Sequence, residues 1–99
     1  MAISQATLGT GATTIFTSSG SNATTAMFFM NDNVSARTLN VHVVQSGGTA
    51  GTTNQIIKAV NIDGGDTYVI NTEKLVLGNG DTIQASASAG SSIYATVSH

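Results

Sequence analysis

The sequence predicts an all-β protein, a small β-sandwich or jelly roll of about seven or eight short antiparallel strands. Apolar and polar residues alternate with a period of two along the chain, and no heptad or sustained helical period is present. Turn-forming residues recur at intervals of roughly 8–12 residues, the spacing typical of such folds. The 99 residues, of which 40% are hydrophobic, allow one domain with one modest core.

Two segments of the second half begin alike, with Gly65-Asp66-Thr67 and Gly80-Asp81-Thr82. Glycine adopts positive φ without a Cβ clash, aspartate hydrogen-bonds nearby backbone amides, and threonine favours extended backbone. Each segment therefore predicts a tight turn that leads into a strand. Asn79-Gly80 further predicts a type I′ hairpin turn.

The remaining elements follow in order between these turns. We expect strands at residues 13–17, 23–30, 38–44, 55–60, 67–71, 82–88 and 91–98, and either a short strand or one helical turn at residues 72–77. The segment 23–30 is apolar on both faces, which is typical of a central strand covered on both sides. Inward-facing Ala85, Ala87 and Ala95 favour closely packed sheets, or an opposing aromatic from Phe16, Phe28 or Phe29.

Residues 1–12 show little strand signal after Ile3, and we expect them to form an N-terminal arm beside a sandwich domain at 13–99. Such an arm is a candidate for docking on a partner, and it includes Met1, Ala2, Ile3, Ser4 and Gln5. The small residues of 46–54 predict the most flexible loop of the chain. Gly47, Gly48 and Thr49 in this loop are further candidate partner contacts.

Composition excludes several classes of function. Charged residues make up only 8% of the chain, against about 25% in an ordinary soluble domain, and the net charge is −2. The three basic residues are too scattered for a nucleic-acid surface, and no cysteine is present for disulfides or thiolate sites. No secretory signal precedes the domain and the longest apolar run, 26–30, is too short to span a bilayer, so we expect a protein made in the cytoplasm that binds neither nucleic acid nor membrane.

No pattern of catalytic residues is present, and we expect no enzyme activity and no cofactor. Asp63 and Asp66, with Asn61, have the oxygen ligands that calcium prefers, but the spacing matches no calcium loop and favours a plain turn. His42 has no histidine partner other than His99, and the chain lacks a Gly-x-Ser-x-Gly nucleophile motif. The glycine-rich loop lacks the Lys-Ser/Thr ending of a phosphate loop.

The cluster Met27-Phe28-Phe29-Met30 has two interpretations. Such side chains anchor partners in apolar interfaces, but more often they fill a core. The core interpretation is the one we adopt from the sequence.

From about residue 24 to 98, the chain resembles small virion proteins of marine and cyanobacterial phages. The segments that carry the resemblance are Phe28–Asn31, Leu39–Val44, Ser46–Gly48, Thr53–Ile56, Gly65–Tyr68, Glu73–Leu77, Gly80–Ala87 and Tyr94–Ser98. The resemblance implies a small β-sandwich within a phage particle, with no enzymatic activity and no cofactor. Its motifs are structural, so they do not place the protein within the particle.

With this resemblance, the expected function is that of a capsid decoration (cement) protein on the virion surface. It would bind the major capsid protein as a homo-oligomer, for which a trimer is one option. A neck, tail or fibre component that contacts a host receptor through the loop 46–54 or the turn 61–66 is the alternative. A carbohydrate-binding module, which would stack sugars on Tyr68 or Tyr94, ranks third.

Overall fold

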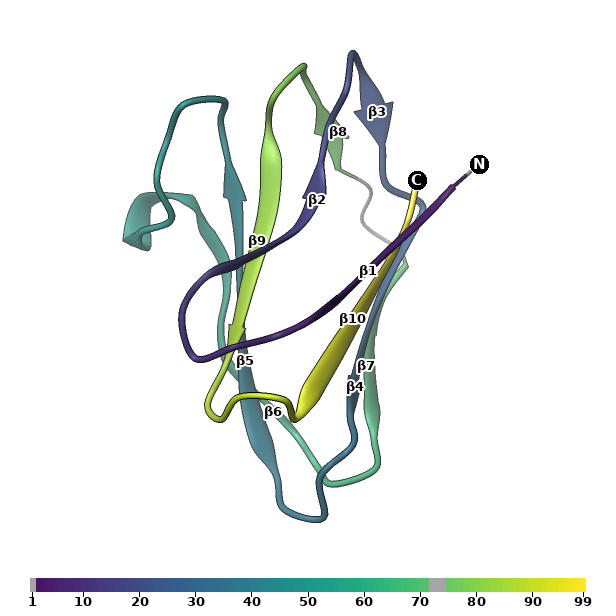
Figure 1. Cartoon of the computed structure of the whole chain (residues 1–99), viewed down its shortest axis with the longest axis vertical. Coiled ribbons are helices and arrows are strands. Elements are labelled where there is room, and N and C mark those ends of the chain that lie inside the picture. Colours follow the sequence, from purple (N-terminus) through teal and green to yellow (C-terminus); the bar gives the residue numbers. More distant parts are fainter. Residues whose placement is uncertain (1, 72–74) are drawn as a thin grey trace.

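Two four-stranded antiparallel sheets pack face to face in this computed structural model, which describes residues 2–71 and 75–99 (Figure 1). Sheet A has the order β1-β10-β4-β7, with bounds Ile3–Thr7, Ile93–Ser98, Ala26–Asn31 and Thr67–Ile70. Sheet B has the order β2-β9-β5-β6, with bounds Thr13–Thr17, Thr82–Ala87, Arg37–Val44 and Gln55–Ile62. Two short strands, β3 (Asn22–Ala23) and β8 (Val76–Leu77), pair with each other, and a 3₁₀ turn, η1 (Thr52–Asn54), precedes β6.

The strand order is that of a jelly roll. When the two short strands are set aside, the remaining strands form nested pairs, β1 with β10, β2 with β9, β4 with β7 and β5 with β6, and successive pairs fall in alternate sheets. All of these pairings are antiparallel. The all-β fold class predicted from the sequence is therefore confirmed.

One apolar core lies between the sheets, because alternate residues of each strand point inward. In β9 and β10 the buried residues recur at every second position, as the alternation predicts. The largest fully buried side chains include those of Phe29, Leu8, Met27, Leu39, Ile83 and Ile93. In β2 the register shifts between Thr14 and Phe16, and this bulge lets the consecutive Ile15 and Phe16 both face the core.

A buried asparagine ties the two sheets together at the end of β4. Asn31 is fully buried, and its side-chain amide donates to the carbonyls of Ile62 at 2.9 Å and Ser35 at 3.0 Å. Its Oδ1 accepts the backbone N–H of Asn33 at 2.9 Å. Because each polar group has a partner, the burial of this amide is compatible with a stable core.

The N-terminal arm is the main error of the sequence prediction. Residues 3–7 form β1, an edge strand of sheet A in register with β10, and Leu8 is fully buried in the core. The inward positions of β1 are the small or polar Ser4 and Ala6, which give almost no hydrophobic alternation. Pairing with a strand more than eighty residues away supplies the order that the local sequence does not show.

Two further expectations need correction. The segment 23–30 is not one doubly covered strand: it divides into β3 and β4, and one face of β4 is exposed. Asn79-Gly80 forms a turn but not a type I′ hairpin, since only Gly80 has positive φ, as in a type II turn. This turn links β8 to β9, which belong to different sheets. Of the predicted element at 72–77, residues 75–77 are described, and β8 covers the last two of them.

Candidate interaction surface

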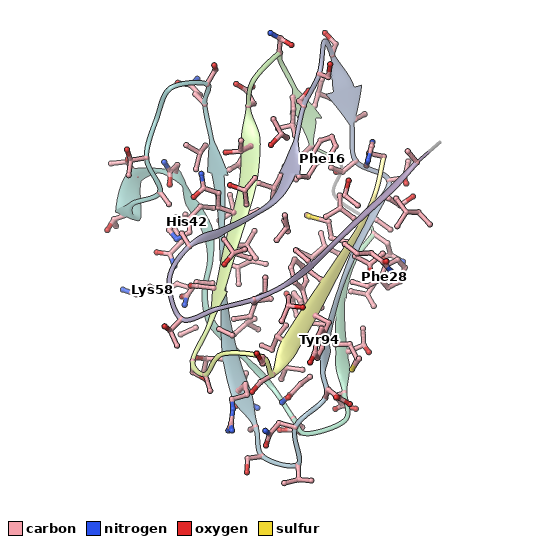
Figure 2. All side chains as sticks on the ribbon, in the orientation of Figure 1. Phe16, Phe28, His42, Lys58 and Tyr94 are labelled. Carbon is pink, nitrogen blue, oxygen red and sulfur yellow. The ribbon has the colours of Figure 1, made fainter. Side chains whose placement is uncertain are left out.

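The outer face of sheet A carries an apolar patch formed by four residues, Phe28, Met30, Val69 and Tyr94. They are 40%, 38%, 42% and 36% exposed, respectively. The strand register brings them together, because Phe28 lies beside Val69 and Met30 beside Tyr94. Figure 2 shows Phe28 pointing away from the core on this side of the molecule, while Lys58 extends from the opposite side.

Uncharged residues surround the apolar patch. The other outward positions of sheet A are Ile3, Gln5, Thr7, Ala26, Thr67, Thr96 and Ser98. Among the described residues the nearest charges along these strands are Asp32 and Asp66, which lie beyond the ends of β4 and β7. The face therefore combines exposed apolar area with the depletion of charge that is typical of protein interface cores.

The cluster at 27–30 divides between the two faces of sheet A. Met27 and Phe29 are buried in the core, whereas Phe28 and Met30 lie on the outer face. The core interpretation is correct for one pair and wrong for the other. Alternation along β10 predicts that Tyr94 faces away from Ile93, Ala95 and Val97, but Val69 was not singled out from the sequence.

The outer face of sheet B is polar, and its side chains bond to one another. Asn40 Oδ1 accepts from Gln55 Nε2 at 3.0 Å and from the backbone N–H of Ala59 at 2.9 Å. Gln84 Nε2 donates to Thr82 Oγ1 at 3.1 Å. The hydrogen bond to Ala59 holds a bulge in β6, where Ala59 has a φ of 53°. Several polar groups of this face are thus paired within the chain.

The candidate loop residues Gly47, Gly48 and Thr49 lie at the end of the molecule beyond β5. All three are exposed, and Gly47 has a φ of 80° in a turn closed by a Gly48 N–H to Gln45 O bond of 2.9 Å. Gly48 and Thr49 border a groove of about 750 Å³ whose lining includes Ile56, Val76 and Leu77. The loop predicted from these small residues therefore contains a hydrogen-bonded turn beside this groove.

Side chains of neighbouring elements hold this loop in place. Asp81 accepts the backbone N–H groups of Ser46 at 3.0 Å and Gly78 at 2.8 Å. Asn54 accepts the Gly51 N–H at 2.9 Å and donates to Thr49 O at 2.9 Å. His42 Nδ1 lies 3.0 Å from Gly51 O. The roles of Asp81 as a turn former and of His42 on a polar face are thus structural.

The N-terminal candidates lie on strand β1 or just before it. Met1 is outside the described residues, and Ala2 pairs with His99 through two backbone hydrogen bonds of 2.7 and 2.9 Å. Ile3 and Gln5 point outward on sheet A, and Ser4 Oγ lies 3.1 Å from His99 Nε2. These residues form part of the sandwich and border the same outer face as the apolar patch.

The acidic turn at 63–66 has the geometry of a plain turn. The N–H of Asp66 donates to Asp63 O at 3.0 Å, Gly65 has a φ of 81°, and Asn61 Nδ2 donates to Asp63 Oδ1 at 2.9 Å. A Cβ at Gly64 would lie 2.4 Å from Val34 O, so glycine is required there. Within residues 2–71 and 75–99, no group of three or more histidine or acidic side chains is placed to hold a metal ion.

Comparison with known proteins gave no match: no family model, no curated protein and no solved structure matches the chain. No helix in the described part of the chain has the length and apolar character needed to cross a membrane.

Proposed function

We propose that this chain is a structural protein of a phage particle, and specifically a decoration protein bound to the outer surface of the capsid. The protein would be made in the host cytoplasm and would add to the assembled lattice of the major capsid protein. The resemblance of residues 24–98 to phage virion proteins supports a location within a phage particle. A jelly roll is also a common architecture of viral capsid domains, which supports the proposal by analogy of fold.

The observation that carries the proposal is the uncharged outer face of sheet A with its apolar patch. A chain with only 8% charged residues has little electrostatic protection against association. The largest apolar patch of a protein is often a functional contact surface, which makes this one a candidate for contact with another protein. Assembly, rather than chemistry on a small substrate, is the function that this surface favours.

The end of the molecule beyond β5 is our candidate for contact with the shell. Gly47, Gly48 and Thr49 form an exposed turn there, and the N-terminal residues Ala2 to Gln5 lie toward the same end of the long axis (Figure 1). Side-chain hydrogen bonds fix the loop, so little conformational entropy is lost when it docks. Binding of many copies to assembled shells, but not to free subunits, would stabilise the shell by mass action.

A binding assay with purified shells tests the proposal. Purified protein is mixed with capsids that lack it, the capsids are sedimented, and the bound protein is quantified. We expect saturable binding and a higher temperature of DNA release from the filled particles. Thr49→Arg should weaken the binding, while Val34→Arg, a matched change at a 97% exposed residue of the opposite end, should leave it unchanged.

Two results of this assay would contradict the proposal. A lack of saturable binding to shells would exclude a decoration role. Binding limited to a few copies at one vertex or on the tail would instead support the neck, tail or fibre alternative. Loss of binding with Val34→Arg but not with Thr49→Arg would place the contact at the other end of the sandwich.

A further inference from the structure

We infer that the outer face of sheet A is covered by the same face of a second copy of this chain, in a two-fold dimer. This inference deepens the proposed function, since it names the partner of the apolar patch within the proposed assembly. Three properties of the face select a second copy over another protein: its charge, its area and the arrangement of its large and small side chains.

Absence of charge is the first property. The described outward positions of β1, β10, β4 and β7 carry no charged side chain, so the face offers no ion pair that would select a charged partner. Two identical faces can therefore approach without like-charge repulsion. Self-contacts of this kind resemble a domain core divided in two, and homodimer interfaces are more apolar than other protein contacts.

Area is the second property. Side chains of this size present roughly 200 Å² each, so the exposed fractions of Phe28, Met30, Val69 and Tyr94 together leave on the order of 300 Å². With the uncharged border, which includes Ile3 at 67% exposure, the face would bury roughly 500 Å² per copy. The total of about 1,000 Å² is the lower limit for a specific interface, which predicts a weak dimer.

Complementarity of size is the third property. Within sheet A, Phe28 lies beside the small Thr96, and Met30 lies beside Tyr94. A two-fold axis parallel to the strands, between β4 and β10, would place Phe28 over Thr96 of the second copy and Met30 over its Tyr94. Large side chains then oppose small ones, and the methionine sulfur meets an aromatic ring, which is a favourable contact.

The outer face of sheet B does not have these properties. Its outward side chains are Thr, Ser, Asn, Gln and His, and several of them are hydrogen-bonded to each other. The adjoining edge strand β6 carries Lys58 and the Ala59 bulge, two features that oppose association of edges. We therefore expect self-association through the outer face of sheet A and not through that of sheet B.

Sedimentation velocity over a range of protein concentrations tests the inference. We expect the mass of the wild-type protein to rise from 10.0 kDa toward twice that value as the concentration passes the dissociation constant. Thr96→Lys on β10 should weaken the dimer by at least tenfold, because it places a charge and a long side chain opposite Phe28. The matched control Gln84→Lys, on β9 of sheet B, should leave the association unchanged. Circular dichroism is used to verify that both variants remain folded.

A second variant keeps the test informative if Thr96→Lys fails to fold. Phe28→Thr retains a strand-forming residue and should also weaken the dimer, while Ile56→Thr, at a 49% exposed residue of sheet B, should not. A wild-type protein that stays monomeric, or that forms a trimer, would overturn the two-fold pairing. If Phe28→Thr dimerised as strongly as the wild-type protein, the two-fold pairing would be overturned as well.

The shell-binding assay separates this inference from the proposed function. A dimer that does not bind shells would leave the inference standing and contradict the decoration role. A monomer that binds shells through Phe28 would support the decoration role and overturn the dimer. It would show that the apolar patch contacts the capsid protein.

Discussion

The outer faces of the two sheets differ although the sheets have the same number of strands and share one core. Sheet B presents polar side chains that bond to each other, whereas sheet A presents Phe28, Met30, Val69 and Tyr94 without a charge beside them. The stability of the domain requires the inner faces, and nothing in the fold requires an apolar outer face. Under the proposed function, the outer face of sheet A is covered by a partner, whereas several polar groups on the outer face of sheet B are paired within the chain.

The first prediction concerns the inner face that both sheets share. Leu8→Ala removes a fully buried side chain that follows β1, and we expect the free energy of unfolding to fall by about 2–5 kcal/mol. Denaturant unfolding followed by circular dichroism measures the change. A loss below about 0.5 kcal/mol, the range of surface substitutions, would restore the interpretation of residues 1–12 as an arm outside the sandwich.

The second prediction concerns the polar network of sheet B. Asn40→Ala removes the acceptor that the Ala59 N–H and the Gln55 amide share, and because water can reach these groups we expect a loss of about 0.5–1.5 kcal/mol in the free energy of unfolding. The control Thr14→Ala removes an exposed side chain of the same sheet and should cost much less. Equal stability of the two variants would show that the network does not stabilise the outer face of sheet B.

The third prediction concerns the β6 bulge. Ala59 has a φ of 53°, a conformation that costs an L-residue roughly 1–2 kcal/mol, whereas glycine adopts it freely. Because glycine also loses more backbone entropy on folding, we expect Ala59→Gly to raise the free energy of unfolding by up to about 1 kcal/mol. Thermal unfolding measures the change, and a lower melting temperature would contradict the bulge geometry.

The smallest change in stability is predicted for the apolar patch itself. The double variant Phe28→Thr with Tyr94→Thr alters only partly exposed side chains, so the free energy of unfolding at low protein concentration should change by no more than about 0.5 kcal/mol per site. The association should be the property that is lost. A large loss of stability in the isolated domain would show that these side chains serve folding, and would remove the contrast between the two faces.

Much of the fold could be predicted because alternation is a local property. The strand expected at 13–17 has the bounds of β2, and the inward series Ile83, Ala85, Ala87 is buried as the alternation predicts. Strand β1 was missed because its inward residues Ser4 and Ala6 are small, and its order comes from pairing with β10. Turn chemistry at Asn79-Gly80 predicted a reversal of the chain, but not which sheets the flanking strands enter.

The candidate site was harder to predict than the fold. Alternation shows that Phe28 and Phe29 lie on opposite faces, but it does not show which of those faces another part of the same chain covers. The apolar patch also needs the pairing of β10 with β4 and of β4 with β7, which joins residues from distant parts of the sequence. The loop residues Gly47, Gly48 and Thr49 and the N-terminal residues were found from composition alone, and their role as shell contacts stays a prediction.

The most direct test of the decoration role is the number of copies of this protein in a purified phage particle. Quantitative mass spectrometry gives that number relative to the major capsid protein. We predict a ratio near one to one, or a simple fraction set by the symmetry of the shell. A total of about a dozen copies or fewer would contradict the decoration role, because so few molecules fit a neck, tail or fibre but not a lattice.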